Sequence, residues 1–400
     1  MLNRRLDLLI DYPFQRLAAL LDGPPGAEPL SMALGEPQHP LPPMVAGIIA
    51  DSAASFGKYP PLNGTPEFRA AAAAWASRRF ALPDGLLDPE RHLLPLGGSR
   101  EGLFLLAQVV CPSGRTGKRR PVVLLPNPLY QVYAAAALMA GAEPVFVPAT
   151  ASDGFLPDFQ ALPKAVLQST ALAYLGNPAN PQGAVASAER LAEYIALARR
   201  HGFVLAVDEC YSEIYDRGPP PGALAVAAAI DGGFENVVVL HSLSKRSSVP
   251  GLRSGFLAGD ARVIAGFAKL RAYAGAAIPL PLLAASIALW NDEAHVEANR
   301  ALYRAKFDIA EALLGGHPGF HRPPGGFFLW HRVGDGEAAA LRLWREAGIR
   351  VLPGAYLARD QADGGNPGSA YIRVALVHDL ETTRRGLSRL ASVLTPAEAG

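Results

Sequence analysis

Residues 241–255 read HSLSKRSSVPGLRSG and follow the apolar run from Val237 to Leu240. That run predicts a short buried strand, and apolar residues resume after the segment. Serine hydroxyls surround Lys245, and Arg253 follows later in the same segment. Hydroxyls and arginine forks bind phosphate oxygens, and a lysine in a partly desolvated, cationic site has a lowered pKa and becomes a nucleophile. The segment therefore suits an imine-forming amine beside a phosphate. The alternative is a surface loop with a solvated lysine.

Length and composition limit the class of protein. The chain has 400 residues, more than a single hydrophobic core usually holds, which predicts two domains. Its formal net charge is +1, so no basic surface for nucleic acid is expected. The two cysteines, Cys111 and Cys210, exclude a disulfide framework and fit the reducing cytoplasm.

The sequence predicts neither a membrane protein nor a metalloprotein. The apolar run at the start is short and is interrupted by Asp7 and Asp11, so no signal peptide is expected. No stretch approaches the length of a membrane span. The histidines lack His-Glu-x-x-His spacing and the two cysteines lie far apart in the sequence, so we expect no metal site.

Strand-like and helix-like segments alternate through the middle of the chain. This alternation predicts an α/β fold in which a mostly parallel sheet has helices on both faces. The predicted strands are 93–96, 121–125, 144–147, 171–175, 203–207, 236–240 and 255–258, and the predicted helices include 66–79, 101–109 and 187–201. In such sheets the loops at the carboxyl ends of the strands build the site. The loops that carry chemically capable residues are 127–133, 177–183, 208–211 and 242–245.

Several of these loop residues have a candidate role on chemical grounds. Asp208 ends an apolar strand, and a buried carboxylate needs a cation such as a protonated pyridine nitrogen; a helix cap or a structural ion pair is the alternative. Asn180 and Tyr211 could both hydrogen-bond a phenolate oxygen. Tyr130 offers a ring face to a planar cofactor, or else it packs in the core. The glycine turn at 97–99 precedes a helix whose free N–H groups could bind an anion, although many α/β proteins have such turns.

Six stretches of the chain carry a family resemblance. They read YPF (12–14), GEPQHP (35–40), GSREGLF (98–104), NPLYQVY (127–133), DECYSEIY (208–215) and SLSKRSSVPG (242–251). Together they resemble the class I/II aminotransferases, the fold-type I enzymes that use pyridoxal 5'-phosphate (PLP), from about Tyr12 to the end of the chain. Within that family, the sequence resembles the bacterial N-succinyldiaminopimelate aminotransferases more closely. It departs from the family pattern at Gln182, where Thr or Ser is usual, and at Ser248, where Asn is expected.

The resemblance implies a role for each matching residue. Lys245 would carry the cofactor as an imine and would then move the proton between the substrate α-carbon and the cofactor. Asp208 would keep the pyridine nitrogen protonated. The other implied cofactor contacts are stacking by Tyr130, 3'-oxygen binding by Asn180 and Tyr211, and phosphate binding by the turn at Gly98, the backbone N–H groups of Ser99 and Arg100, Ser242 and Arg253.

Two further implied contacts concern the substrate and a partner subunit. Arg373, in the predicted strand 371–374, would clamp the substrate α-carboxylate bidentately, with Gly35 and Asn180 nearby. A charge on a surface strand is the alternative for Arg373. Tyr59 would reach the phosphate of a neighbouring subunit, which implies a homodimer with shared active sites.

The resemblance also implies a three-layer αβα large domain and a smaller α+β domain. The large, PLP-binding domain would span residues 46–281. The arm at residues 1–45 would join the small C-terminal domain at residues 282–400. Within the small domain the sequence predicts strands at 326–330 and 349–352, with helices at 337–347 and 380–392.

The implied reaction is transamination between a small-molecule amino donor and a 2-oxo acid. We expect glutamate and N-succinyl-2-amino-6-oxopimelate, in lysine biosynthesis in the cytoplasm. The distal carboxylates would need further cations, for which Arg100, Arg246 and Arg271 are candidates. The alternatives are an aspartate, aromatic or branched-chain aminotransferase, and a PLP-dependent carbon–sulfur lyase, decarboxylase or acyltransferase. A regulator would need an added DNA-binding domain, for which we expect no room, and a non-enzymatic scaffold would be expected to lack Lys245 or Asp208.

Overall fold

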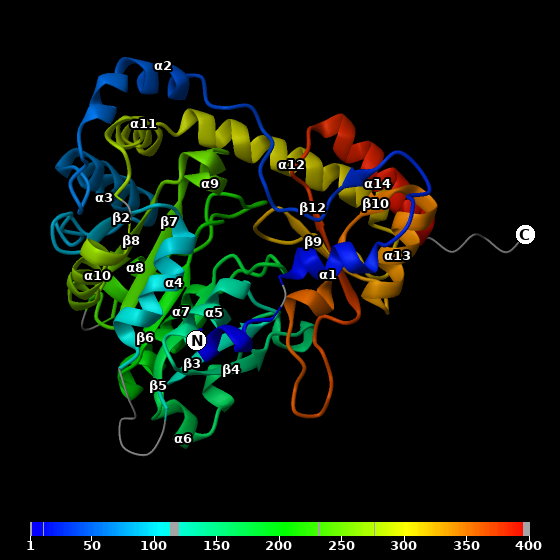
Figure 1. Cartoon of the computed structure of the whole chain (residues 1–400), viewed down its shortest axis with the longest axis horizontal. Coiled ribbons are helices and arrows are strands. Elements are labelled where there is room, and N and C mark those ends of the chain that lie inside the picture. The colour runs from blue at the N-terminus through cyan, green and yellow to red at the C-terminus, as the bar shows by residue number, and fades with distance from the viewer. Residues whose placement is uncertain (1, 11, 113–119, 231–232, 276, 395–400) are drawn as a thin grey trace, which may run out of the picture.

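The structure, a computed structural model, describes residues 2–10, 12–112, 120–230, 233–275 and 277–394. Within these residues the largest sheet has seven strands and occupies the left half of Figure 1. Strands β3 to β7 run parallel, whereas β8 is antiparallel to both of its neighbours. In spatial order the strands are β2 (Leu93–Leu96), β8 (Gly255–Gly259), β7 (Val237–Ser242), β6 (Val204–Asp208), β5 (Thr170–Gly176), β3 (Val122–Asn127) and β4 (Glu143–Pro148).

Alternate residues of these strands pack against two separate layers of helices. In β3, Val122 and Leu124 belong to one apolar cluster, whereas Val123 and Leu125 belong to the other. Because both faces are buried, the strands are apolar along most of their length, as parallel strands usually are. The expected mostly parallel α/β fold is therefore confirmed. The first cluster includes residues of α3 (Pro66–Phe80), α7 (Ala188–His201), α8 (Ala223–Ala228) and α11 (Leu280–Asn291), and the second includes α4 (Ser99–Val110), α5 (Gln131–Met139) and α10 (Ala261–Ala274).

Local capping explains where two of the predicted helices begin and end. The Thr65 side chain accepts a hydrogen bond from the Phe68 N–H at 3.3 Å, and Pro66 occupies the first turn of α3, where its missing N–H costs little. The Ser187 hydroxyl caps α7 in the same way, and Gly202 ends that helix in the left-handed conformation. These signals are local, so the sequence alone predicted both helices to within one or two residues.

Two smaller sheets connect the N-terminal arm with the C-terminal part of the chain. Strand β1 (Leu30–Ser31) pairs in parallel with β10 (Ile349–Arg350). A second sheet contains β11 (Leu352–Pro353), β12 (Tyr371–Ala375) and β9 (Phe328–Arg332), all antiparallel. The predicted strand 349–352 is wrong as a single element, because its two halves pair with different partners. The predicted strand 326–330 starts at Phe328, since Gly326 has a φ of +78° that strand residues do not adopt.

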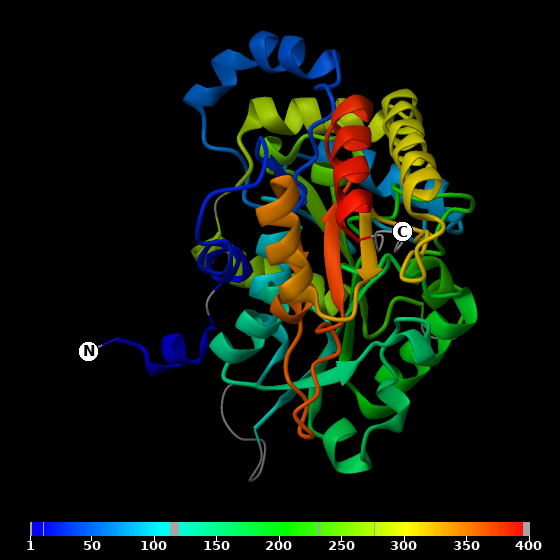
Figure 2. The same cartoon turned by 90° about the vertical axis from the view of Figure 1, so that its right-hand side faces the viewer.

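The remaining helices complete the two halves of the molecule. In Figure 1, α13 and α14 lie on the right with α1 beside α13, where Leu17 and Trp344 share an apolar cluster, and Figure 2 looks onto that side. No helix within the described residues is both long enough and apolar enough to cross a bilayer. These helices are α1 (Pro13–Leu20), α2 (Met44–Asp51), α6 (Lys164–Leu167), α9 (Leu243–Arg246), α12 (Ala294–Leu314), α13 (Gly336–Ala347) and α14 (Leu380–Leu394), with 3₁₀ turns at Arg4–Leu8, Ala53–Gly57, Ala151–Asp153, Phe159–Ala161, Pro250–Leu252 and Gly354–Leu357.

The carboxyl ends of the parallel strands meet at one edge of the large sheet. Strand β3 ends at Asn127, β5 at Gly176, β6 at Asp208 and β7 at Ser242. The four loops singled out from the sequence leave the sheet from these ends. The fold thus brings together residues that are distant in the sequence, at the edge where open α/β sheets hold their ligands.

Candidate active site

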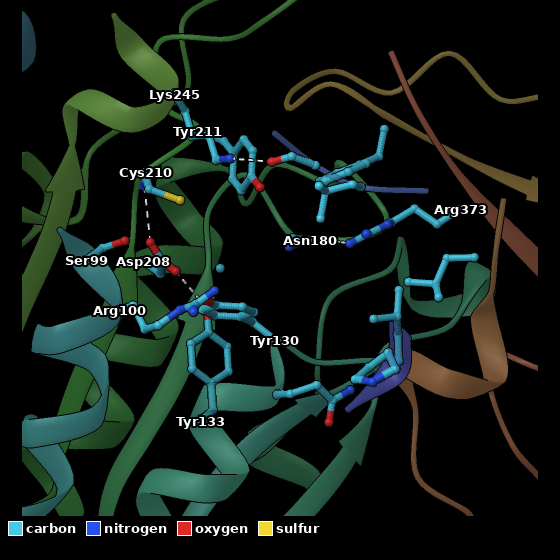
Figure 3. Close-up of a pocket in the computed structure, with 18 of the residues that line it drawn as sticks. Ser99, Arg100, Tyr130, Tyr133, Asn180, Asp208, Cys210, Tyr211, Lys245 and Arg373 are labelled. Carbon is cyan, nitrogen blue, oxygen red and sulfur yellow. Dashed lines mark hydrogen bonds between the residues drawn. The ribbon is translucent and has the colours of Figure 1, made fainter. Parts of the chain in front are cut away.

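A cavity of about 170 Å³ lies at this edge of the sheet. Its walls come from the strand ends, from the N-terminal arm and from the C-terminal sheet, and Figure 3 shows the side chains that face it. The predicted site residues that line it are Gly35, Ser99, Arg100, Tyr130, Asn180, Asp208, Tyr211, Lys245 and Arg373. The predicted residues that do not line it are Gly98, Ser242, Arg253 and Tyr59.

Lys245 projects into the cavity from α9, a single turn that follows β7. The Ser242 hydroxyl caps this turn by accepting a hydrogen bond from the Ser244 N–H at 3.2 Å. The Lys245 ammonium donates to the Gly35 carbonyl oxygen at 2.5 Å. Loss of water contacts is the main cause that lowers the pKa of Lys245 to about 8, and the nearby Arg373 guanidinium contributes to this lowering. About one tenth of the amine is therefore neutral near pH 7, far more than for an ordinary lysine, and the neutral form is the nucleophile.

Asp208 is a buried carboxylate without a cationic partner. It is 6% exposed, and its oxygens accept hydrogen bonds from the Tyr133 hydroxyl at 3.0 Å and from the Cys210 N–H at 3.2 Å. No lysine, arginine or histidine among the described residues forms an ion pair with it, and burial raises the pKa of Asp208. A buried carboxylate in this state is suited to a cationic ring nitrogen supplied by a ligand.

Tyr133 is a site residue that the sequence interpretation missed. Besides its hydrogen bond to Asp208, its ring stacks on Tyr174 with centroids 4.7 Å apart and meets Tyr130 edge-on at 5.7 Å. Burial raises the pKa of Tyr133 well above its usual value, so the hydroxyl stays protonated and donates a hydrogen bond to the carboxylate. The i, i+3 spacing from Tyr130 was the signal available in the sequence, because it puts both rings on one side of a helical turn.

An anion cradle lies beside the cavity at the start of α4. Gly98 caps this helix with a φ of +92°, and the N–H groups of Ser99 and Arg100 have no acceptor within the helix. Arg253 donates to the Gly97 carbonyl oxygen at 2.9 Å, so near to the turn that a Cβ at Gly98 would lie 2.3 Å from its Nη2. The left-handed φ of Gly98 favours glycine here, and the guanidinium and the helix N-terminus lie where a phosphate could bind both. The Ser242 hydroxyl donates to the Ser254 carbonyl oxygen at 3.4 Å, so its predicted phosphate contact remains a prediction.

Arg373 presents a second charge to the cavity, from β12. It is 6% exposed, which excludes the alternative of a surface charge on a strand. Its Nη atoms donate to Asn180 Oδ1 at 3.2 Å and to the Ala33 carbonyl oxygen at 2.8 Å, and its guanidinium lies 4.2 Å from the centre of the Phe328 ring. Burial lowers the pKa of Arg373 to about 10, and no carboxylate among the described residues pairs with it.

Two aromatic residues complete the walls. Tyr211 is 7% exposed and packs edge-on against Phe327 at 5.2 Å, and burial raises the pKa of its hydroxyl well above the usual value. The Tyr130 hydroxyl accepts a hydrogen bond from Arg100 Nε at 2.8 Å, and burial raises the pKa of Tyr130 to about 12. Both hydroxyls therefore remain protonated at neutral pH and can donate to an oxygen in the cavity.

The structure removes two of the three candidate cations for a distal carboxylate. Arg246 is 2% exposed and points away from the cavity, donating to the Leu289 carbonyl oxygen and to Glu293, both at 2.6 Å. Arg271 is equally buried and binds the Pro95 carbonyl oxygen. Both were reasonable candidates from the sequence, because burial direction is not visible there. Arg100 alone of the three lines the cavity.

Two further segments, around Tyr59 and at the start of α1, stand in different relations to the cavity. Tyr59 is fully exposed, at 101% of the reference area, and touches no part of the cavity of its own chain. Its predicted contact with a neighbouring subunit remains a prediction. The start of α1 lines the cavity through residues 12–14, a stretch to which the sequence interpretation gave no role.

Comparison with known proteins gives consistent matches over almost the whole chain. Residues 28–390 match the family described as aminotransferase class I and II. An LL-diaminopimelate aminotransferase from Dehalococcoides mccartyi is 30% identical over 99% of this chain and 100% of the relative. An aminotransferase structure from Neisseria meningitidis has a TM-score of 0.92 and 39% identity, over 98% of this chain and 100% of that one. A probable N-succinyldiaminopimelate aminotransferase from Thermus thermophilus has a TM-score of 0.82 and 26% identity, over 96% and 100% of the two chains.

Proposed function

Because this chain belongs to the class I and II aminotransferases, which depend on PLP, we propose that it exchanges an amino group between glutamate and a long dicarboxylic 2-oxo acid. The acceptor we propose is N-succinyl-2-amino-6-oxopimelate, a precursor of lysine. The observation that supports this proposal is the set of charged side chains that line the cavity: Lys245, Asp208, Arg373 and Arg100. Asp208 is the single carboxylate among the described lining residues.

The residues around the cavity fit the cofactor. When bound, PLP supplies an electron sink that makes the substrate α-proton removable. Asp208 lacks a cation and would pair with the protonated ring nitrogen. Asn180 and the protonated hydroxyl of Tyr211 would bind the 3'-oxygen, and Tyr130 would lie along the ring. The phosphate would occupy the cradle formed by the start of α4 and Arg253, where the N–H groups of the first helical turn and a guanidinium lie close together.

Lys245 would perform the proton transfer. Its amine has a pKa of about 8, close to working pH, where a general base is most effective. The Gly35 carbonyl oxygen accepts from the amine at 2.5 Å and so fixes its position in the cavity, which Arg373 also lines. Arg373 would bind the α-carboxylate through its guanidinium, and Asn180 would keep that guanidinium oriented.

The charges of the cavity favour a succinylated substrate over free diaminopimelate. The far end of free diaminopimelate carries an ammonium group beside its carboxylate, whereas the succinyl amide removes the ammonium charge and adds a second carboxylate. Figure 3 shows Arg100 on the opposite side of the view from Arg373. The distal ammonium of free diaminopimelate would be repelled by the Arg100 guanidinium, whereas the added succinyl carboxylate could accept a further charge-assisted hydrogen bond from it.

A substrate panel tests this proposal. We expect kcat/KM with 2-oxoglutarate to be higher for N-succinyl-LL-diaminopimelate than for LL-diaminopimelate, aspartate, phenylalanine or leucine. The Arg100→Gln variant should lose about tenfold on the succinylated donor, the value of one charge-assisted hydrogen bond, and little on phenylalanine. If free LL-diaminopimelate is the better donor, the enzyme acts on diaminopimelate without the succinyl group, and the proposed substrate is wrong. If phenylalanine or leucine exceeds both, the lysine pathway is excluded.

A half-reaction with glutamate separates transamination from the other reactions of this cofactor. Only a transaminase converts the bound cofactor to its amino form and releases 2-oxoglutarate. A carbon–sulfur lyase or a decarboxylase would release a different product and would leave the cofactor unchanged. Absence of 2-oxoglutarate formation would therefore exclude the proposed reaction.

We further propose that the enzyme is a cytoplasmic homodimer in which Tyr59 completes the site of the neighbouring subunit. The support is the full exposure of Tyr59, together with the exposed Tyr273 at 91% and Phe56 at 56%, because large exposed aromatic side chains are typical of interfaces. Mixing an inactive Tyr59→Ala variant with Lys245→Ala should restore some activity, because one hybrid site regains both side chains. A fully active monomer in ultracentrifugation would contradict the proposal.

A further inference from the structure

Lys306 is a second lysine with an unusual environment, and it lies outside the cavity. It belongs to α12, is 0% exposed, and forms no ion pair among the described residues. Its ammonium donates to the Leu376 carbonyl oxygen at 3.1 Å and to His39 Nε2 at 2.5 Å, and it lies 4.7 Å from the centre of the Tyr303 ring. The exposed carboxylate of Asp379 is the charge that acts on it. Burying an ammonium group without a paired carboxylate costs free energy.

The hydrogen bonds next to Lys306 have a single consistent direction. Asn299 Nδ2 donates to the carbonyl oxygens of Lys245 at 3.2 Å and of Arg246 at 3.1 Å. Asn299 Oδ1 must then accept, and its partner at 2.5 Å is Nδ1 of His39, which therefore carries the ring proton. The other ring nitrogen of His39 is left as the acceptor for Lys306. Burial lowers the pKa of His39 to about 4, so the ring is neutral, as this arrangement requires.

This chain of hydrogen bonds holds Lys245 from two directions. It ends on the backbone carbonyls of α9, which carries Lys245. It also fixes His39, which is close in sequence to Gly35, the acceptor of the Lys245 ammonium. The Gln38 N–H donates to the Val377 carbonyl oxygen at 3.3 Å, so the arm is fastened to the segment after β12 at the same place. The backbone of Lys245 and the acceptor of its amine are thus positioned by one network.

We propose that Lys306, His39 and Asn299 form a positioning relay that fixes the orientation of Lys245 and the protonation of its Nζ. The proposal rests on the proposed role of Lys245 as the cofactor lysine. None of the three relay residues lines the cavity, so they act through Lys245 and not on the substrate. Their loss should therefore reduce kcat more than it changes KM.

The test compares cofactor-loaded wild type with the variants Lys306→Met and Asn299→Asp. Asn299→Asp keeps the shape of the side chain but turns a donor into an acceptor that faces two carbonyl oxygens. Leu314→Ala is the matched control, because Leu314 is a 2% exposed residue of the same helix that does not contact the relay. For each protein we would measure kcat, KM, the melting temperature, and the pH midpoint at which the visible absorbance of the bound cofactor changes.

We expect each relay variant to lose about tenfold in kcat with KM nearly unchanged, the loss typical of a misplaced catalytic group. The absorbance midpoint should rise by about one pH unit, because a loosened Lys245 nitrogen gains water contacts that stabilise its charged form. Leu314→Ala should lower the melting temperature without moving the midpoint. Relay variants whose midpoint stays at the wild-type value would overturn the proposal. If Lys306→Met does not fold, the comparison of Asn299→Asp with Leu314→Ala decides alone.

Peptide mapping after borohydride reduction separates this inference from the proposed function. If the reduced cofactor is found on a lysine other than Lys245, the assignment of the cofactor lysine is wrong. If it is found on Lys245 and the relay variants behave like Leu314→Ala, the relay alone is wrong.

Discussion

Buried charges around the cavity differ from buried charges elsewhere in this protein by their partners. Asp208 and Arg373 are each 6% exposed and Lys245 is half-buried, and among the described residues none of the three forms an ion pair. Arg246 is more deeply buried at 2% exposure, yet it pairs with Glu293 at 2.6 Å. Burial alone therefore does not mark a functional charge. A functional charge is indicated by burial together with the absence of a counter-charge. A protein tolerates the free-energy cost of an unpaired buried charge where a ligand supplies the partner.

The ion pairs away from the cavity show the structural pattern clearly. Arg300 pairs with the buried Glu213 at 3.0 Å, and the same carboxylate binds Arg79 at 2.6 Å. The buried His241 lies 3.0 Å from Glu209. Among the buried charges that the structure describes outside the cavity, Lys306 is the one without an ion pair, and its network leads back to Lys245. The comparison thus predicts where a substitution should affect turnover and where it should affect stability only.

The largest effect is expected at Lys245. Replacing it with alanine removes the base and the covalent anchor together, so transamination should fall by about 10⁴-fold or more. Initial rates of 2-oxoglutarate formation would measure the loss. Lys164→Ala, at an exposed position on α6, is the control and should keep wild-type turnover. A Lys245→Ala protein with substantial activity would show that Lys245 is not the catalytic lysine and would contradict the functional reading of unpaired buried charges.

Asp208→Asn should follow, with a loss of about 3 kcal/mol of transition-state stabilisation, roughly 10²-fold in kcat. The amide keeps the shape and the hydrogen bond with Tyr133 but cannot neutralise a ring nitrogen. Cofactor binding should weaken less than turnover does, which equilibrium dialysis would measure. Turnover near the wild-type rate would mean that the aspartate is structural.

The same substitution should stabilise the cofactor-free protein in a pH-dependent way. Burial raises the pKa of Asp208 in the folded state, so folding favours the protonated carboxyl. The ionised carboxylate destabilises the wild type most above this raised pKa, and the penalty diminishes as the pH falls through it. Asp208→Asn should therefore exceed the wild type in stability at neutral pH and lose that advantage in acid, in denaturant titrations at several pH values.

Arg373→Lys should reduce kcat/KM by roughly 10²-fold, because one ammonium replaces a bidentate fork that is buried in the cavity. The loss should be similar for every amino donor, since all present the same α-carboxylate. Steady-state kinetics with glutamate and with the succinylated donor would measure it. A loss confined to one donor would place Arg373 at the distal end of the substrate.

The smallest effect on turnover is expected at Arg246. Arg246→Met removes an ion pair and the contacts of the guanidinium with the rings of Trp75 and Trp290. The protein should therefore lose about 2 kcal/mol of stability. Its kcat should stay within about twofold of the wild type at temperatures where it is folded. Thermal unfolding and initial rates together test this. A large loss of turnover without a loss of stability would contradict the division between paired and unpaired charges.

The sequence predicted the large sheet well and the small sheets less well. Strands such as β6 are apolar along their length, so their boundaries are visible within one or two residues. The segment 349–352 is equally apolar, but it divides between two partners that lie far away in the sequence. Strand pairing depends on long-range contacts, which a local pattern does not contain.

By itself, the sequence determined the α/β fold and the presence of Lys245 and Asp208 at the ends of apolar strands, because hydrophobic periodicity is a local property and strand ends follow from it. Only the tertiary structure decided which charges stay unpaired. The Tyr133–Asp208 contact spans 75 residues and the Lys306–His39 contact spans 267. Arg100, Arg246 and Arg271 look equivalent in the sequence, and packing alone sends the first to the cavity and the other two into ion pairs. Side-chain direction and partner follow from how distant segments pack, so they appear only in the folded chain.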